Sequence, residues 1–276
     1  VLLRAYSPGG LSQVEDALVP AARMAASVAF ESGAGPHSIG DLEKILAGTS
    51  VSLSGSINLT SETVSGSART DEIETLFQLL HMSFTNPRVD GSILANQQRS
   101  IREQVRGALR SPRGQFSRAV QELLANGDPR LEPVDADVWD QVTEGEIREV
   151  YGDRFADAAD FAFFVVGTVD PDDVAAIAAQ YIGSLPSSRT VQPGTTISAP
   201  ETGHEWVESV QDTGYDLFVG DQSQIVRAGS EPVAQVAGIL NGEYEWSRRE
   251  NHRFSSMIDL LEIRMREEIR EAAGGT

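Results

Sequence analysis

The residues that could carry chemistry are few and lie far apart in this sequence. The four histidines are His37, His81, His204 and His252, and no two lie within one helical turn. A zinc hydrolase of the HExxH or HxxEH type needs two imidazoles and a carboxylate on one helix, so that both rings reach one ion while the carboxylate takes a proton from bound water. Neither motif occurs, and the stretch HEWVE at His204 has glutamate where the second histidine is needed.

Other catalytic constellations are also missing. The chain has no cysteine, which excludes thiolate chemistry and disulfides. No GxSxG nucleophile elbow and no GKS or GKT phosphate loop is found. The glycines at 33 and 35 follow a predicted helix instead of a strand and lack the third glycine of a dinucleotide-binding turn. We therefore expect no catalytic residue in this chain, which on its own should hydrolyse nothing.

Charge narrows the range of partners. The 276 residues carry 41 acidic and 22 basic side chains, a formal charge of −19, and Lys44 is the only lysine. Such an acidic surface repels phosphate backbones, which argues against a nucleic-acid partner. No apolar run approaches the roughly 18 residues of a membrane-spanning helix, so no membrane insertion is expected.

The hydrophobic pattern predicts an α+β fold with an antiparallel-rich sheet packed against helices. Alternating or buried apolar residues predict strands over 1–6, 51–60, 62–69, 161–169, 223–228 and 232–240. Apolar residues at three- and four-residue steps predict helices over 13–31, 39–47, 71–84, 90–110, 113–125, 144–155, 171–182 and 247–273.

Both ends of the chain share one order of elements, an apolar strand, a glycine-containing turn and a long helix. This weak internal similarity indicates a duplicated domain. A polar stretch rich in proline and glycine lies between the two copies and is typical of a linker. We predict one domain over residues 1–195, a linker over 196–222, and the beginning of a following, truncated domain over 223–276.

Three stretches resemble one known family. FFVVGTVDPDDVAAIAAQYIGSLP at 163–186 is similar to a strand–VGxxDPxxV–helix unit that closes the first domain of each half of the M16 (insulinase/pitrilysin-like) zinc peptidases. LLHMSFTNPRVD at 79–90 resembles the turn before their central helices. LRAYSPGGLS, together with residues 242–276, resembles the large bacterial members in which two halves are fused in one chain.

The resemblance implies an M16 peptidase-like (LuxS/MPP-like metallohydrolase) domain from the non-catalytic C-terminal half. In the active half HxxEH lies on the first long helix, and in the register we favour Arg23, Ala26 and Ser27 occupy its three positions. No metal is then expected in this chain, and zinc is expected in an N-terminal catalytic half that would be its intramolecular partner. The implied role is to enclose and position peptide substrate for a zinc metalloendopeptidase. The alternative is a non-enzymatic scaffold or interaction subunit of the same fold.

One substrate-binding residue follows from the same resemblance. The last domain of the family supplies an arginine that reaches the substrate carbonyl at the zinc, and Arg270 in IREAAGGT matches that position. Arg264 and Arg266 are alternatives in a shifted register, and a solvated arginine that favours the helix dipole is the plainer interpretation. A bacterial periplasmic or envelope location is favoured by the resemblance alone.

Overall fold

The computed structural model describes residues 1–187, 218, 220–242 and 244–272, with side chains described up to Arg270. The chain divides into two units, Val1–Pro232 and Val233–Thr276, each of which is described by itself. Most of the predicted linker 196–222 lies outside the described residues. In the described part of the chain, no helix is both long and apolar enough to cross a membrane.

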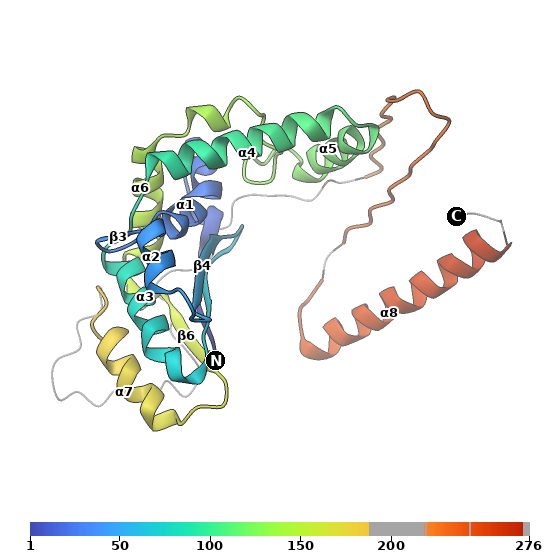
Figure 1. The fold of residues 1–276 in the computed structure, drawn as a ribbon. Helices are drawn as coiled ribbons and strands as arrows, with labels where there is room; N and C mark the ends of the chain where they lie inside the picture. The colour runs from blue at the N-terminus through green and yellow to red at the C-terminus, as the bar shows by residue number, and fades with distance from the viewer. Residues whose placement is uncertain (188–217, 219, 243, 273–276) are drawn as a thin grey trace. The chain divides into compact units, whose positions relative to one another are not determined.

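The first unit is built on a four-stranded, fully antiparallel sheet (Figure 1). The strand order is β4-β5-β1-β6. The strands are β1 (Leu2–Pro8), β4 (Ser52–Ile57), β5 (Ser61–Ser67) and β6 (Ala162–Val166), and β2 (Gly33–Ala34) pairs separately with β3 (His37–Ser38). In the register of β1, Ala5 lies between Val64 of β5 and Phe163 of β6, so these three side chains point to the same face.

Helices cover that face of the sheet (Figure 1). The helices of the first unit are α1 (Val19–Glu31), α2 (Ile39–Ile45), α3 (Ile73–Thr85), α4 (Gly91–Leu109), α5 (Pro112–Ala125), α6 (Glu144–Phe155) and α7 (Pro171–Tyr181). Five of these helices begin with a side-chain cap, whereas α1 and α3 have none. The Thr143 side chain accepts a hydrogen bond from the Glu146 N–H in a capping box, and the Asp170 carboxylate accepts one from the Asp172 N–H.

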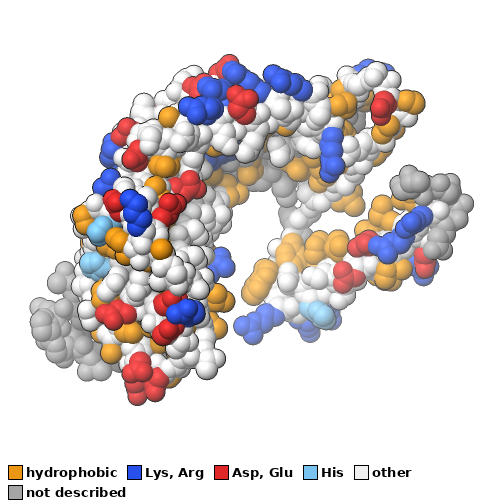
Figure 2. All heavy atoms as spheres, in the orientation of Figure 1, with side chains coloured by type: hydrophobic (Ala, Val, Ile, Leu, Met, Phe, Trp, Pro, Cys, Tyr) orange, Lys and Arg blue, Asp and Glu red, His pale blue; other side chains and the backbone are white. Residues whose placement is uncertain are grey.

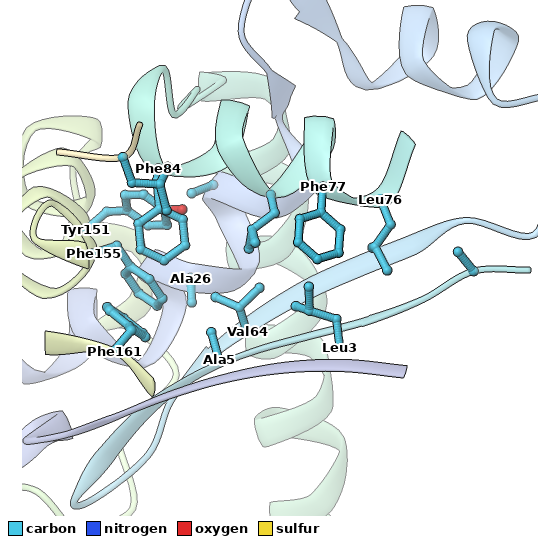
Figure 3. Close-up of a cluster of buried hydrophobic side chains, with 14 of the residues drawn as sticks. Leu3, Ala5, Ala26, Val64, Leu76, Phe77, Phe84, Tyr151, Phe155 and Phe161 are labelled. Atoms are coloured by element: carbon cyan, nitrogen blue, oxygen red, sulfur yellow. The ribbon is translucent and has the colours of Figure 1, made fainter. Parts of the chain in front are cut away.

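The core of this unit is aromatic and aliphatic (Figure 3). Leu76 and Phe77 of α3 are fully buried and point toward Leu3 and Val64 on the sheet. A stack of rings continues the cluster, formed by Tyr151 and Phe155 of α6 and by Phe161 just before β6. The centroids of the Tyr151 and Phe155 rings are 4.6 Å apart. Fully burying one such side chain stabilises the fold by about 1.5–3 kcal/mol, so this cluster holds the helices to the sheet.

The first long helix starts later than predicted. The sequence pattern predicts residues 13–31, whereas α1 begins at Val19 and residues 10–13 and 16–18 form short 3₁₀ turns. Pro20 supplies the reason, because proline fits the first turn of a helix but removes a hydrogen bond and clashes further inside it. The helix therefore begins just before Pro20. Leu11 and Val14 are buried, and they lie in and next to the first 3₁₀ turn.

The strands predicted over 223–228 and 232–240 are absent, and this prediction is wrong. The described residues of both ranges form no ladder, and the exposed fractions of Ile225, Val236 and Leu240 are 78%, 90% and 94%. A strand requires a partner for its backbone groups, and these ranges have none among the described residues. The alternating apolar pattern was therefore insufficient evidence for strands.

The second unit contains one long helix, α8 (Arg248–Arg266), followed by a π-helical turn over Glu267–Ala272. The Ser247 hydroxyl caps its start by accepting a hydrogen bond from the Glu250 N–H at 3.1 Å. Apolar residues at three- and four-residue steps predicted this helix, and they remain exposed along it, as the hydrophobic side chains on α8 in Figure 2 show.

Candidate functional site on helix α1

Helix α1 carries the three positions at which the family resemblance expects the zinc motif. Arg23, Ala26 and Ser27 follow the spacing i, i+3, i+4 and therefore share one face of the helix. They differ in depth. Ala26 is 3% exposed and packs in the main core, whereas Arg23 and Ser27 are half-buried at its border.

Arg23 has a structural role in this arrangement. Its Nη2 donates to the carbonyl oxygens of Arg130 at 2.7 Å and Glu132 at 3.0 Å, so the guanidinium holds the loop between α5 and α6 against α1. Burial lowers the pKa of Arg23 below the usual arginine range, yet the group stays charged at neutral pH. A fixed positive charge at this place repels a divalent cation instead of binding it.

Arginines of α4 and α5 also hold the loop between α5 and α6 in place. Each of three of these arginines forms an ion pair with a loop aspartate. The pairs are Arg102–Asp140, Arg106–Asp137 and Arg118–Asp135, with N–O distances of 2.8, 2.6 and 2.7 Å. Basic side chains gather along α4 on the face shown in Figure 2. These contacts fix the loop carbonyls that receive Arg23.

Ser27 belongs to a polar chain that joins α1 to α4. Its hydroxyl donates to the Gln97 side-chain oxygen at 3.0 Å, and the Gln97 amide donates to the Glu31 carboxylate at 2.8 Å. The network therefore links two helices and offers a single carboxylate in addition to neutral oxygens.

This donor set does not fit zinc. Protein zinc sites use histidine, cysteine or carboxylate ligands, usually three or four. No group of three or more such side chains comes together anywhere among the described residues. The face of α1 has one cation, one methyl group and one hydroxyl at the three motif positions, so no hydrolytic step can be derived from it.

The three described histidines belong to no cluster of potential metal ligands. His37 lies in β3, His81 on α3 with its ring 6.3 Å from that of Tyr181, and His252 on α8. His204 and the stretch HEWVE lie outside the described residues.

Arg270 lies in the π-helical turn after α8, and its side chain is exposed. The two alternative arginines are engaged, since Arg264 pairs with Glu267 at 3.5 Å and Arg266 with Glu262 at 2.5 Å. Within the described part of the chain Arg270 forms no ion pair. It lines one end of a shallow groove beside Ile269 and Met265 on the apolar face of the helix.

A buried charge pair escaped the sequence analysis. Glu62 of β5 is fully buried, and its Oε1 accepts hydrogen bonds from the Gly10 N–H at 2.8 Å and from Arg154 Nη1 at 3.4 Å. Arg154 on α6 is itself 6% exposed. The signal was available, because the alternation of β5 puts Glu62 on the same inward face as Val64.

An antiparallel sheet covered on one face by helices, with no metal-binding cluster on the described part, defines a class of protein. It is an α+β domain with helices packed on one face of an antiparallel sheet. Comparison with known proteins specifies the class further. No protein-family profile matches the chain.

The curated relatives are proteases by name. The chain is 22% identical over 278 aligned positions to a "Probable zinc protease PqqL" of Haemophilus influenzae, an alignment that covers 100% of this chain and 28% of that protein. It is 27% identical over 157 positions to the protein of the same name from Escherichia coli K12, covering 57% of this chain and 17% of the relative. The chain thus spans less than a third of the curated relatives it matches.

Solved structures share the fold. The crystal structure of the periplasmic protease PqqL from Escherichia coli superposes with a TM-score of 0.59 at 23% identity, covering 71% of this chain and 21% of that one. An M16 peptidase inactive domain from Pseudomonas fluorescens superposes with a TM-score of 0.56 at 18% identity, covering 69% of this chain and 47% of that one. These findings confirm the expected fold class and the resemblance to M16 zinc peptidases.

Proposed function

We propose that this chain serves as the substrate-enclosing, non-catalytic part of a zinc metalloendopeptidase, where it positions peptides for a catalytic half in the same protein. The observation that carries the proposal is the state of α1. The fold is that of an M16 peptidase domain, yet Arg23 occupies the place of the first zinc ligand in our register and is committed to carbonyls of its own chain.

The partners of this function are an N-terminal half that holds zinc, and a peptide. Two features support this assignment. The relatives are named zinc proteases and are much longer than this chain, and the donor set on the described residues leaves zinc to be held elsewhere. One of the structural neighbours is described as periplasmic, which supports the periplasm as the compartment.

We assign Arg270 the role of contacting the substrate carbonyl in the intact enzyme. A guanidinium fixed before the reaction stabilises the oxyanion that forms when water attacks a peptide carbonyl. Arg270 fits this role better than Arg264 or Arg266 because its charge is not already committed to a glutamate among the described residues.

The test uses the full-length protein that contains this segment and a fluorogenic peptide mixture. Arg270→Ala should lower kcat/KM by about 10²-fold or more, as loss of one oxyanion donor does. Arg264→Ala is the matched control, because it removes an arginine of the same helical stretch, and its kinetics should match the wild type.

Two results would contradict the proposal. Equal kinetics for Arg270→Ala and the wild type would remove the assignment of that arginine. A full-length protein that binds peptides but hydrolyses none, with zinc supplied, would establish the scaffold function in place of the enzymatic one.

A further inference from the structure

The four-stranded sheet has a second face, opposite the one that the helices cover. Leu3 and Ala5 of β1 are buried and point to the helices (Figure 3). Successive residues of a strand point to opposite faces of a sheet. Leu2 and Arg4 of β1 therefore lie on the second face, where both are exposed.

Large apolar side chains gather on this face at β1 and β6. In the antiparallel register Leu2 lies opposite Val166, and Arg4 lies opposite Phe164. Directly opposite residues have Cβ atoms about 4.5–5.5 Å apart, so the four side chains form one continuous surface, which we call the β1–β6 patch. The exposed fractions of Leu2, Phe164 and Val166 are 61%, 54% and 66%. Contiguous exposed apolar side chains mark interaction sites.

The rest of the face beside the patch is neutral. Its two rows continue across β5 and β4 with serine at every position, namely Ser67, Ser52, Ser65 and Ser54. The hydroxyls of Ser52 and Ser67 are hydrogen-bonded to each other at 2.9 Å, and the Ser54 hydroxyl donates to the Ser65 carbonyl oxygen at 3.4 Å. No carboxylate occurs in either row.

Arg4 is the one charged residue of these two rows. It forms no ion pair with any residue that the structure describes. The chain as a whole carries a formal charge of −19, but charges more than about 8 Å away are largely screened at physiological ionic strength. A carboxylate next to Arg4 would therefore be attracted, because the nearest positions on the sheet hold only hydroxyl and apolar side chains.

The combination favours a peptide as the partner. Arginine and aromatic side chains are enriched at protein interfaces, whereas an anionic membrane or a nucleic acid would bring many negative charges to an acidic chain. A second copy fits poorly, because a twofold contact centred on the patch would place Arg4 against the same arginine of the other copy. In an extended peptide, every second side chain points to the same side, as Leu2 and Arg4 do on β1.

We propose that the β1–β6 patch binds an extended peptide segment in which a side-chain carboxylate lies two residues from a large apolar side chain on either side. The carboxylate would pair with Arg4, and the apolar side chains would cover Phe164 and its neighbours. This inference rests on the proposed function, since it names the class of substrate peptide that the chain would position.

Three peptides that differ at one position test the role of charge. Each has the sequence Gly-Ser-Leu-Ser-Xaa-Ser-Phe-Ser-Gly with both termini blocked, carries an uncharged fluorophore, and has Glu, Gln or Lys at Xaa. Fluorescence anisotropy measures the affinity of each for this chain. The Glu peptide should bind about three- to fivefold more tightly than the Gln peptide, as expected of an exposed ion pair, and the Lys peptide should bind most weakly.

Two pairs of substitutions locate the site. Arg4→Gln should give the Glu and Gln peptides equal affinity, whereas Arg110→Gln, at an exposed arginine that ends α4, should preserve the preference. Phe164→Ser should weaken binding of all three peptides about fivefold, because burial of its exposed half is lost. Ile45→Ser removes a side chain on α2 that is 58% exposed and should change no affinity. Thermal unfolding of each variant checks that it is folded.

Equal affinity of the wild type for the Glu and Lys peptides would overturn the proposal. Equal effects of the two arginine variants, or of Phe164→Ser and Ile45→Ser, would overturn it as well. Failure of the proposed function gives a different result. A full-length protein that hydrolyses no peptide, together with an intact preference of this chain for the Glu peptide, would contradict the proposed function and support the binding site.

Discussion

Removing the arginine of the buried charge pair should be among the most damaging single changes in this fold. In Arg154→Met, Glu62 keeps the Gly10 N–H as a hydrogen-bond donor but loses the cation that accompanies it into the core. Glu62 is 0% exposed, so water cannot replace the guanidinium. Arg154 also pairs with Asp153, but that carboxylate is 62% exposed and is solvated when the arginine is removed.

The size of the expected stability loss follows from the cost of leaving one buried charge without its partner. Breaking a buried ion pair by removing one partner costs about 3–5 kcal/mol, because the remaining charge is uncompensated. In a unit of this size each kcal/mol lowers the melting temperature by about 2–4 °C, so a decrease of roughly 6–20 °C is expected. Neutralising both partners, in Glu62→Gln combined with Arg154→Met, should recover most of the loss.

Urea unfolding followed by circular dichroism measures Arg154→Met, Glu62→Gln and the double variant against the wild type. The double variant should be more stable than Arg154→Met alone, which is the signature of a pair whose charges compensate each other. A cost below about 1 kcal/mol for Arg154→Met, or a double variant as unstable as the sum of the two single ones, would refute this reasoning.

Three further outcomes are expected. Arg23→Ala should lower stability by about 1–3 kcal/mol by leaving the carbonyls of Arg130 and Glu132 without their donor, and proteolysis should then cut that loop first; unaltered digestion would contradict this. The hydroxyl and the N–H of Ser92 lower the pKa of Asp90 in the folded state. The carboxylate therefore stabilises the fold above the pKa of an unfolded aspartate, about 4, and this stabilisation is lost as the pH falls. Between pH 5 and pH 3 the urea midpoint of Asp90→Asn should therefore fall less than that of the wild type. Elemental analysis of the purified chain should find no stoichiometric zinc, and one tightly held ion per chain would disprove our register for α1.

Local signals in the sequence predicted most of the first unit. Caps such as Thr143 and Asp170, and the stop at Pro87 after α3, are local and strong, and the helices begin or end near them. The start of α1 was placed too early because apolar spacing was weighed above Pro20, although proline restricts a helix more than apolar periodicity extends it.

Features that depend on distant partners could not be predicted in the same way. The apolar alternation at 223–240 predicted strands, but pairing is a property of two segments, and one pattern cannot reveal whether a partner exists. The hydrogen bonds of Arg23 join residues more than a hundred positions apart, and the pocket beside α2 is lined by residues from six helices and strands. The absence of a zinc motif, in contrast, was readable directly from the spacing of the histidines.

The scarcity of lysine gives α2 an unusual experimental property. Lys44, the only lysine of the chain, is exposed on this helix. An amine-reactive dye would therefore couple to no side chain other than Lys44, with the α-amine of the N-terminus as the other reactive amine, and needs no engineered cysteine. The emission of a dye on Lys44 would report changes in the surroundings of α2.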